Sequence, residues 1–263
     1  KVRNNQFIMG DISFDQLSVN DNDLNYWMIK PASFNDSTKY PLLMYVYGGP
    51  GSQTVKNSFG GSNYYWFQML ANKYNVIIVS VDNRGTGARG SEFKKLTYKQ
   101  LGKYETEDQV AAAKFFGKLS FIDENRMGIW GWSYGGYMSS LALAKGNDVF
   151  KMAIAVAPVT NWRYYDNIYT ERYMGLPQEN GSGYDDNSPI NFVKDIKGKY
   201  LIIHGTGDDN VHFQNSVMMV NELIKNNIPF DSEFYPNKNH GIYGGATRYH
   251  LYNKMTNFIL ENL

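Results

Sequence analysis

The stretch that decides the fold is GIWGWSYGGYMSSLALA, residues 128–144, in which a short apolar run passes through glycines into a helical segment. Within it, Gly131, Ser133 and Gly135 form the pattern G-x-S-x-G. This pattern is typical of a nucleophile elbow, whose flanking glycines let a strand and a helix approach closely around an exposed serine. We therefore predict that Ser133 is a nucleophile and that the backbone N–H of Tyr134 helps to bind an oxyanion. The alternative is a plain glycine-rich turn.

Around this stretch, short apolar runs alternate with longer amphipathic segments, which is the pattern of a mostly parallel sheet flanked by helices. We predict strands at residues 25–31, 40–47, 75–82, 126–132, 152–158, 199–205 and 230–235. We predict helices at residues 62–73, 106–119, 134–145, 213–226 and 247–261. The stretch 162–193 is rich in Tyr, Asn and Gly, and we interpret it as an excursion over the mouth of the sheet. The fold class is therefore α/β.

Composition excludes several classes of function. The 263 residues carry a net charge of +1, which gives no electrostatic footprint for nucleic acid or an acidic membrane. The absence of cysteine excludes disulfides, thiol catalysis and cysteine metal sites, but it leaves the compartment open. The longest apolar run, VIIVSV at 76–81, is too short to span a membrane. Because the chain lacks an initiator Met and an apolar signal core, we interpret it as a soluble piece of something longer.

A second glycine cluster, GTGARG at residues 85–90, matches the G-x-G-x-x-G string of dinucleotide sites and follows a predicted strand. A dinucleotide site also needs an acidic residue about 20 positions later, at the tip of a second strand. Here that distance falls in ETEDQVAAAKFF, residues 105–116, which is predicted to be helical. We therefore interpret the cluster as a flexible surface loop.

A nucleophile elbow predicts an acid and then a histidine, each in a loop at the carboxyl end of a later strand. Asp208 and Asp209 follow the strand predicted at 199–205, and His240 follows the strand predicted at 230–235. Composition does not choose between the two aspartates, and the second could instead cap the following helix. The other histidines have structural interpretations, namely core packing for His204, helix-start capping for His212 and surface exposure for His250.

The segment NWRYYDNIY, residues 161–169, supplies three aromatic residues that can converge, Trp162, Tyr165 and Tyr169. A proline ring is compact and apolar and brings no N–H group, so a tight aromatic box selects it by shape and apolar burial. The alternative is an aromatic loop packed on the core. From these residues alone, both interpretations stay open.

Four motifs resemble the dipeptidyl peptidase IV group of the prolyl oligopeptidase family of serine peptidases, in order and at suitable spacing from about Tyr40 to the C-terminus. They are GWSYGGYMSSLAL, APVTNWRYYDNIYTERYMGLP, HGTGDDNVHFQ and HGIYG. The resemblance implies an α/β-hydrolase fold, with Asp208 as the acid and Asp209 as a structural residue. It implies that the Tyr47 hydroxyl joins the Tyr134 N–H as oxyanion donor. The substrate-binding residues that it implies are Tyr134, Val159, Trp162, Tyr165, Tyr169 and Val211 around the proline ring, and Asn210 on a substrate carbonyl.

The resemblance also implies an activity. Ser133 attacks the carbonyl after proline, His240 takes and returns the proton, and Asp208 holds the imidazole, so that N-terminal X-Pro or X-Ala dipeptides are released from peptides. No metal or cofactor is required. Alternatives are a carboxylesterase or acylaminoacyl peptidase with the same triad and another pocket, and a catalytically silent binding domain, against which the intact triad argues.

Members of this group are expected to dimerise through the last helix and to be secreted, periplasmic or exposed at the cell surface. They carry a β-propeller before the hydrolase, and paired glutamates on it grip the substrate's amino terminus. Neither feature is recognisable in this sequence, so the resemblance implies that residues 1–263 are the hydrolase part of a longer enzyme.

Overall fold

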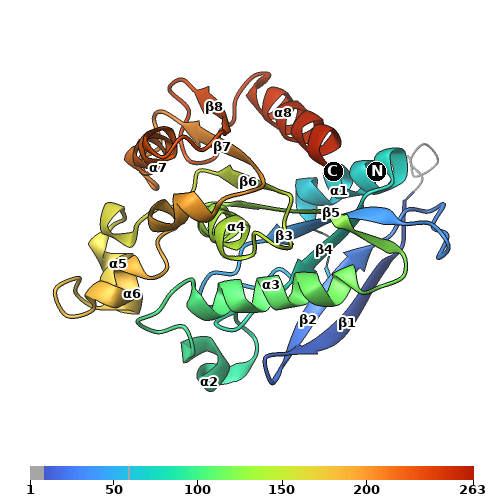
Figure 1. Cartoon of the computed structure of the whole chain (residues 1–263), viewed down its shortest axis with the longest axis horizontal. Coiled ribbons are helices and arrows are strands. Elements are labelled where there is room, and N and C mark those ends of the chain that lie inside the picture. Colours follow the sequence, from blue (N-terminus) through green and yellow to red (C-terminus); the bar gives the residue numbers. More distant parts are fainter. Residues whose placement is uncertain (1–8, 59) are drawn as a thin grey trace.

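The computed structural model describes residues 9–58 and 60–263, and its eight strands form one sheet (Figure 1). The strand order is β1-β2-β4-β3-β5-β6-β7-β8. The strands are β1 (Ile12–Val19), β2 (Asn22–Ile29), β3 (Tyr40–Val46), β4 (Ile77–Val81), β5 (Ile122–Trp132), β6 (Met152–Val156), β7 (Lys199–Gly205) and β8 (Asp231–Tyr235). β2 pairs antiparallel with β1 and with β4, whereas β3 to β8 run parallel. The predicted mostly parallel sheet is confirmed.

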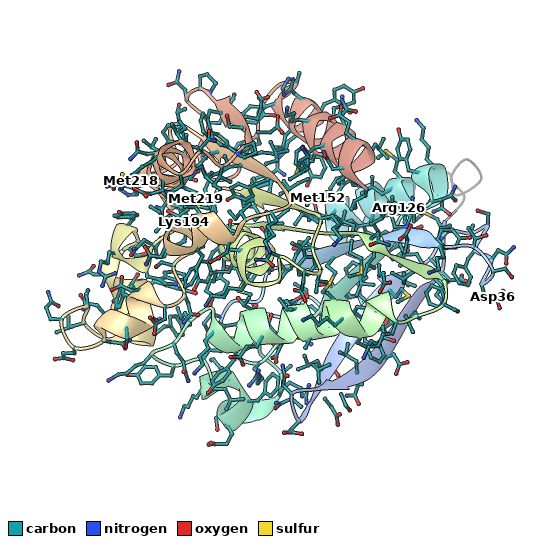
Figure 2. All side chains as sticks on the ribbon, viewed as in Figure 1. Asp36, Arg126, Met152, Lys194, Met218 and Met219 are labelled. Carbon is teal, nitrogen blue, oxygen red and sulfur yellow. The ribbon has the colours of Figure 1, made fainter. Side chains whose placement is uncertain are left out.

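Helices cover both faces of the sheet because successive strand residues point to opposite sides. In β5, Ile129 joins an apolar cluster under three helices, and its neighbour Trp130 joins a second cluster under two others. The first face carries α3 (Lys103–Gly117), α4 (Tyr134–Lys145) and α7 (Gln214–Lys225), and the second carries α1 (Gly61–Tyr74) and α8 (Thr247–Asn262). In Figure 2, Met152 of β6 lies in the interior between these layers, whereas Asp36 lies at the periphery.

Every predicted strand and helix is present within a few residues, and the differences concern short or exposed elements. β1 was not predicted because only one of its side chains, Leu17, is buried. Three short helices were also not predicted, α2 (Gly90–Lys95), α5 (Asn167–Met174) and α6 (Gly181–Asp185). Two of them lie in the excursion 162–193, together with the 3₁₀ turns η2 (Trp162–Tyr164) and η3 (Pro189–Asp195). Helices this short lack the repeating apolar face that periodicity detects.

The interpretation of GTGARG as a surface loop is correct only for its second half. Gly85 and Thr86 are buried, whereas Ala88 and Gly90 are exposed. Arg84, immediately before the cluster, makes a buried ion pair of 2.7 Å with Asp108 on α3. This pair draws the start of the cluster onto the helix.

The parallel strands all point the same way, so the segments that follow them lie at one edge of the sheet. Tyr47 follows β3, Ser133 follows β5, Asp208 follows β7 and His240 follows β8. Ligands of open α/β sheets bind at this carboxyl edge. No helix in the part of the chain that the structure describes is long and apolar enough to cross a bilayer.

Candidate active site

Ser133 occupies a strained turn between β5 and α4. Its backbone has φ 61° and ψ −117°, and its N–H donates to the Val156 carbonyl at 2.8 Å. A Cβ atom on Gly131 would lie 2.3 Å from the Gly135 carbonyl oxygen, and one on Gly135 would lie 2.1 Å from the Val46 carbonyl oxygen. Both positions therefore exclude every side chain larger than hydrogen, which is the steric origin of the G-x-S-x-G pattern.

The two residues predicted to supply the oxyanion donors have neighbouring rings. Tyr134 is the first residue of α4, where backbone N–H groups have no acceptor within the helix and the helix end is positive. The ring centroids of Tyr47 and Tyr134 are 6.0 Å apart. Burial raises the pKa of the Tyr47 phenol, so this hydroxyl stays protonated at neutral pH and is able to donate a hydrogen bond.

The acid and the histidine meet across two loops. His240 Nδ1 lies 2.7 Å from Asp208 Oδ2, and the Asp208 side chain is fully buried, whereas 22% of the His240 side chain is exposed. The other carboxylate oxygen, Asp208 Oδ1, accepts the backbone N–H groups of Asn210 and Val211 at 3.0 Å each. Asp209 is exposed, and α7 has no side-chain cap. The structure therefore places Asp208, and not Asp209, against the imidazole.

The environment of Asp208 favours its charged form. Burial by itself would raise the pKa of this carboxyl, but hydrogen bonds from His204 and His240, the charge of His240 and the Asn210 N–H hold it well below its usual range. The group is thus a carboxylate at neutral pH. A carboxylate that accepts from Nδ1 leaves the other ring nitrogen of His240, Nε2, as the base.

A hydrogen bond joins the elbow to the histidine loop. The indole Nε1–H of Trp132 donates to the carbonyl of His240 at 3.0 Å. Trp132 directly precedes Ser133, so this bond ties the loop of His240 to the turn that holds Ser133. Sequence reasoning missed this role, because nothing in the local pattern identifies a partner 108 residues away.

The predicted aromatic box is assembled beside the elbow. Trp162 and Tyr169 stack with ring centroids 5.8 Å apart, and Tyr165 stands edge-on to both, at 5.8 and 5.4 Å. The ring of Tyr134 is 5.4 Å from Trp162. Val159 and Val211 are buried in the same apolar cluster. Asn210 accepts a hydrogen bond of 2.6 Å from the Tyr165 hydroxyl, so the residue predicted to hold a substrate carbonyl lies at the edge of the box.

Glu105, at the start of α3, is a site neighbour that sequence reasoning missed. Its side chain is fully buried and accepts the Tyr134 hydroxyl at 2.7 Å and the Gly102 N–H at 2.9 Å. Burial raises the pKa of this carboxyl to about 7, although both hydrogen bonds oppose the rise. The helix was predicted to begin at residue 106, and no local pattern indicates that Glu105 contacts a residue 29 positions away.

His204 is fully buried and packs edge-on against Phe213, as the core-packing interpretation predicted, but that interpretation missed the polar contacts of its ring. Its Nε2 lies 3.0 Å from Asp208 Oδ2, the oxygen that also accepts from His240. The signal was available, because a strand-end residue four positions before the acid faces the same loop. His212 is exposed and its backbone carbonyl, not its ring, accepts from the Asn215 N–H. His250 is exposed, as predicted, and its Nδ1 bonds the Tyr235 hydroxyl at 2.8 Å.

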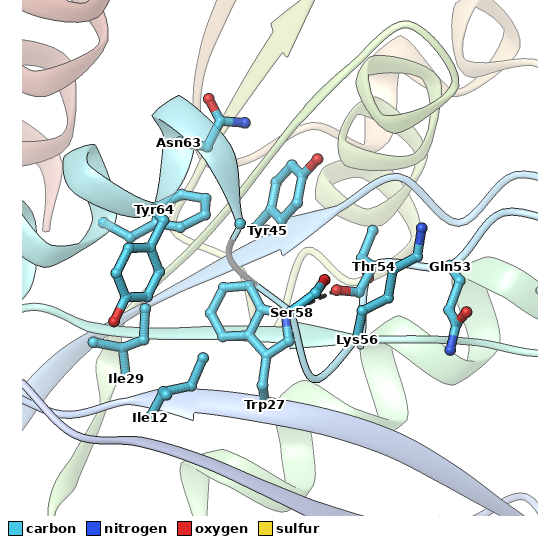
Figure 3. A pocket seen from close by; sticks show the side chains of 12 residues that line it. Ile12, Trp27, Ile29, Tyr45, Gln53, Thr54, Lys56, Ser58, Asn63 and Tyr64 are labelled. Atoms are coloured by element: carbon cyan, nitrogen blue, oxygen red, sulfur yellow. Dashed lines mark hydrogen bonds between the residues drawn. The ribbon is translucent and has the colours of Figure 1, made fainter. Parts of the chain in front are cut away.

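A cavity of about 310 Å³ lies apart from these residues, between the β1–β2 end of the sheet and α1 (Figure 3). Aromatic side chains of Trp27, Tyr45 and Tyr64 converge on it, with Lys56 and Gln53 at one side. None of the predicted site residues lines this cavity.

Comparisons with known proteins give one consistent result. Residues 59–263 match the model of the prolyl oligopeptidase family. The chain is 47% identical over 249 residues to prolyl endopeptidase FAP of Homo sapiens and 44% identical over 250 residues to dipeptidyl peptidase 4 of Felis catus. Each alignment covers 94% of this chain but 32% of the relative, so the chain spans about a third of these curated relatives. The crystal structure of Porphyromonas gingivalis dipeptidyl peptidase 4 superposes with a TM-score of 0.93 at 47% identity, over 97% of this chain and 36% of that one.

Proposed function

The chain belongs to the prolyl oligopeptidase family of serine peptidases, and we propose that it carries the catalytic machinery of an exopeptidase that releases N-terminal X-Pro or X-Ala dipeptides. The single observation that carries this proposal is the aromatic box of Trp162, Tyr165 and Tyr169 beside the strained serine. The α/β-hydrolase fold of this family supplies the elbow and the two loops for the acid and the base.

In the proposed mechanism, Ser133 Oγ attacks the carbonyl carbon after proline while His240 Nε2 accepts its proton. The tetrahedral intermediate collapses as the C–N bond breaks, and the imidazolium gives its proton to the leaving amine. A water molecule then hydrolyses the ester on Ser133, with His240 again as base. The Asp208 carboxylate, 2.7 Å from His240 Nδ1, holds the ring orientation and stabilises the imidazolium.

Tyr47 and Tyr134 are the proposed oxyanion donors, through a hydroxyl and a backbone N–H. One such donor contributes about 10²- to 10³-fold to kcat in serine peptidases. The raised pKa of Tyr47 supports this role, since only the neutral phenol donates. Tyr165 has the same property, because burial raises the pKa of its phenol to about 12, and it donates to Asn210 instead.

The proposed specificity comes from apolar burial. The proline ring is proposed to pack against the aromatic box of Trp162 and the tyrosines, where a longer or charged side chain would lose hydration without gaining a partner. Alanine fits the same space but buries less surface. Asn210, oriented by Tyr165, is proposed to hold the carbonyl of the residue before proline.

The experiment that tests this proposal compares anilides of Gly-Pro, Gly-Ala and free Pro, with an N-acylated Gly-Pro anilide as the matched probe of the amino terminus. In the natural protein, we expect Gly-Pro to be hydrolysed fastest, Gly-Ala more slowly, and the free-Pro and N-acylated substrates poorly. If the N-acylated substrate is cleaved as fast as the free Gly-Pro anilide, the enzyme is an endopeptidase and not an exopeptidase. Endopeptidase is the activity in the name of one relative. Rapid hydrolysis of simple esters without a proline preference would replace both with an esterase.

We also propose that two copies associate through α8. Tyr249 and Leu260 on this helix are 74% and 41% exposed, and an interface through α8 would cover them. Light scattering measures the mass in solution. A Tyr249→Lys variant is expected to become monomeric, and a wild-type monomer at micromolar concentration contradicts the proposal.

A further inference from the structure

A second imidazole lies behind the proposed catalytic acid. His204, in β7, is fully buried, and its Nε2 lies 3.0 Å from Asp208 Oδ2 and 2.9 Å from the Val211 carbonyl oxygen. Its Nδ1 lies 2.6 Å from the Oγ of Ser216 on α7. Both ring nitrogens of His204 therefore have polar partners, although no solvent reaches the ring.

These partners assign the tautomer of His204. The carboxylate and the carbonyl are acceptors only, so the nitrogen between them, Nε2, carries the hydrogen. Nδ1 then accepts from the Ser216 hydroxyl, which is able to rotate its proton toward the ring. Ser216 thus favours the one neutral form in which His204 donates to Asp208.

Asp208 consequently receives four hydrogen bonds. Two imidazole N–H groups, from His204 and His240, converge on Oδ2, and two backbone N–H groups, from Asn210 and Val211, converge on Oδ1. The four donors therefore fix both oxygens of the carboxylate, and with them its orientation. Because His204 and His240 share one oxygen, each reduces the electron density available to the other.

We propose that His204 is a positioning residue for the catalytic acid. Its Nε2–H fixes the rotation of the Asp208 carboxylate toward His240 and moderates the negative charge that stabilises the His240 imidazolium. This inference rests on the proposed triad. The array Ser216–His204–Asp208 repeats the residue types of that triad, but Ser216 and His204 are both fully buried, so no substrate reaches them.

The groups around Asp208 come from several elements. Asp209 lies in the same loop, His240 comes from the loop after β8, and the Tyr165 hydroxyl approaches through Asn210. Burial and, to a smaller degree, the neighbouring Asp166, Tyr47 and Asp208 raise the pKa of Tyr165 to about 12, so this phenol stays neutral in the working range. On the α7 side, Phe213 stands edge-on to His204 at 5.6 Å. His204 is therefore the buried group whose removal changes the hydrogen bonds of Asp208.

The test uses two variants in the natural protein, His204→Leu and His204→Gln. Leucine removes the donor, whereas the glutamine side-chain N–H reaches about the place of Nε2–H. We expect His204→Leu to lower kcat at least about tenfold, with little change in KM, because a hydrogen bond to a charged group is lost. The acid limb of kcat/KM should also move to higher pH by about half a unit, because the less solvated carboxylate stabilises the imidazolium more. His204→Gln should keep kcat within about threefold of the wild type.

Controls separate this role from packing. His250→Gln breaks the bond of another histidine, to Tyr235, without touching Asp208, and should leave both kinetic constants unchanged. If His204→Leu does not fold, Ser216→Ala supplies the same readout, because loss of the Nδ1 partner weakens the Nε2–H donor and should move the acid limb the same way by less.

Two results would overturn the inference. One is a folded His204→Leu enzyme whose acid limb of kcat/KM does not move. The other is a His204→Gln enzyme that is as impaired as the leucine variant. Fluorophosphonate labelling of wild-type Ser133 tests the triad separately. If the probe does not label Ser133 of the wild type, the proposed function is refuted. If the wild type is labelled but the acid limb of His204→Leu does not move, only the role of His204 is refuted.

Discussion

At Ser133 the backbone holds a positive φ of 61° in a residue that carries a Cβ atom. Such a conformation is sparsely populated and costs of the order of 1–3 kcal/mol, so the surrounding packing must impose it. The imposed turn leaves Ser133 partly exposed at the carboxyl edge of the sheet, directly before the N-terminus of α4. The strained backbone therefore exposes the side chain of the proposed nucleophile.

The Ser133→Ala variant follows from this geometry. Alanine keeps the turn and removes only the oxygen, so we expect kcat to fall by about 10⁴- to 10⁶-fold while the fold is retained. Steady-state kinetics on the Gly-Pro anilide and a thermal melt measure both effects. A variant that keeps more than a tenth of wild-type activity would remove Ser133 from the mechanism.

Asp208 and Asp209 are adjacent in sequence but differ in burial, which makes them a matched pair. Asp208→Asn presents an amide to His240 Nδ1 and favours the wrong tautomer, so kcat should fall by about 10⁴-fold. Asp209→Asn makes the same chemical change on an exposed side chain and should act only on stability or KM, to a small extent. Steady-state kinetics of both variants measure these changes. Equal losses of kcat in the two variants would contradict the assignment of Asp208 as the acid.

At the scale of the element, α3 delivers a buried carboxyl to the site. Glu105 caps the start of the helix and accepts the Tyr134 hydroxyl, so one side chain joins α3 to α4. Because burial raises its pKa from 4.5 to about 7, the native state keeps a proton between these values that the unfolded state has released. The contribution of this group to the free energy of unfolding is therefore present below about pH 4.5 and is lost as pH rises to about 7.

We compare the free energy of unfolding of Glu105→Gln with that of the wild type. The difference should rise in favour of the variant from pH 5 to pH 8, by up to about 3 kcal/mol, because glutamine does not ionise. Urea unfolding at both pH values measures the difference. Glu107→Gln is the matched control, since Glu107 lies on the same helix with a side chain that is 48% exposed. A relative stability of Glu105→Gln that does not change with pH would show that Glu105 ionises normally in the folded protein.

At the scale of the whole molecule, the proposed chemical groups all lie between Tyr47 and His240, whereas the chain spans about a third of its relatives. We propose that the grip on the substrate's amino terminus lies outside residues 1–263. Binding energy from such a remote contact positions the scissile bond, so its absence should lower turnover as well as affinity.

The expected outcome is that the isolated chain, residues 1–263, is labelled slowly at Ser133 by a fluorophosphonate probe and cleaves an X-Pro anilide poorly. A chain extended to the length of these relatives should cleave the same anilide with strong preference for a free amino terminus. Mass spectrometry of the labelled serine and parallel kinetics of the two proteins provide the measurement. Vigorous, amino-terminus-selective cleavage by the isolated chain would place the anchor within it.

The sequence by itself determined the features that depend on local sterics and periodicity. The glycines around Ser133 predict the elbow, because a Cβ atom at Gly131 or Gly135 would collide with backbone. Alternating apolar runs predict the parallel strands, and the order of those strands along the chain places Asp208 and His240 in later loops. Each of these inferences needs only a few neighbouring residues.

Only the tertiary structure decided which distant groups meet. It brings Asp208 to His240 across 32 residues, Glu105 to Tyr134 across 29 and Trp132 to the His240 carbonyl across 108. It also brings the buried His204 within 3.0 Å of the carboxylate of Asp208. The physical reason is that a hydrogen bond depends on ångström-scale placement of loops by the packed sheet, and a sequence pattern records the residue types but not that placement.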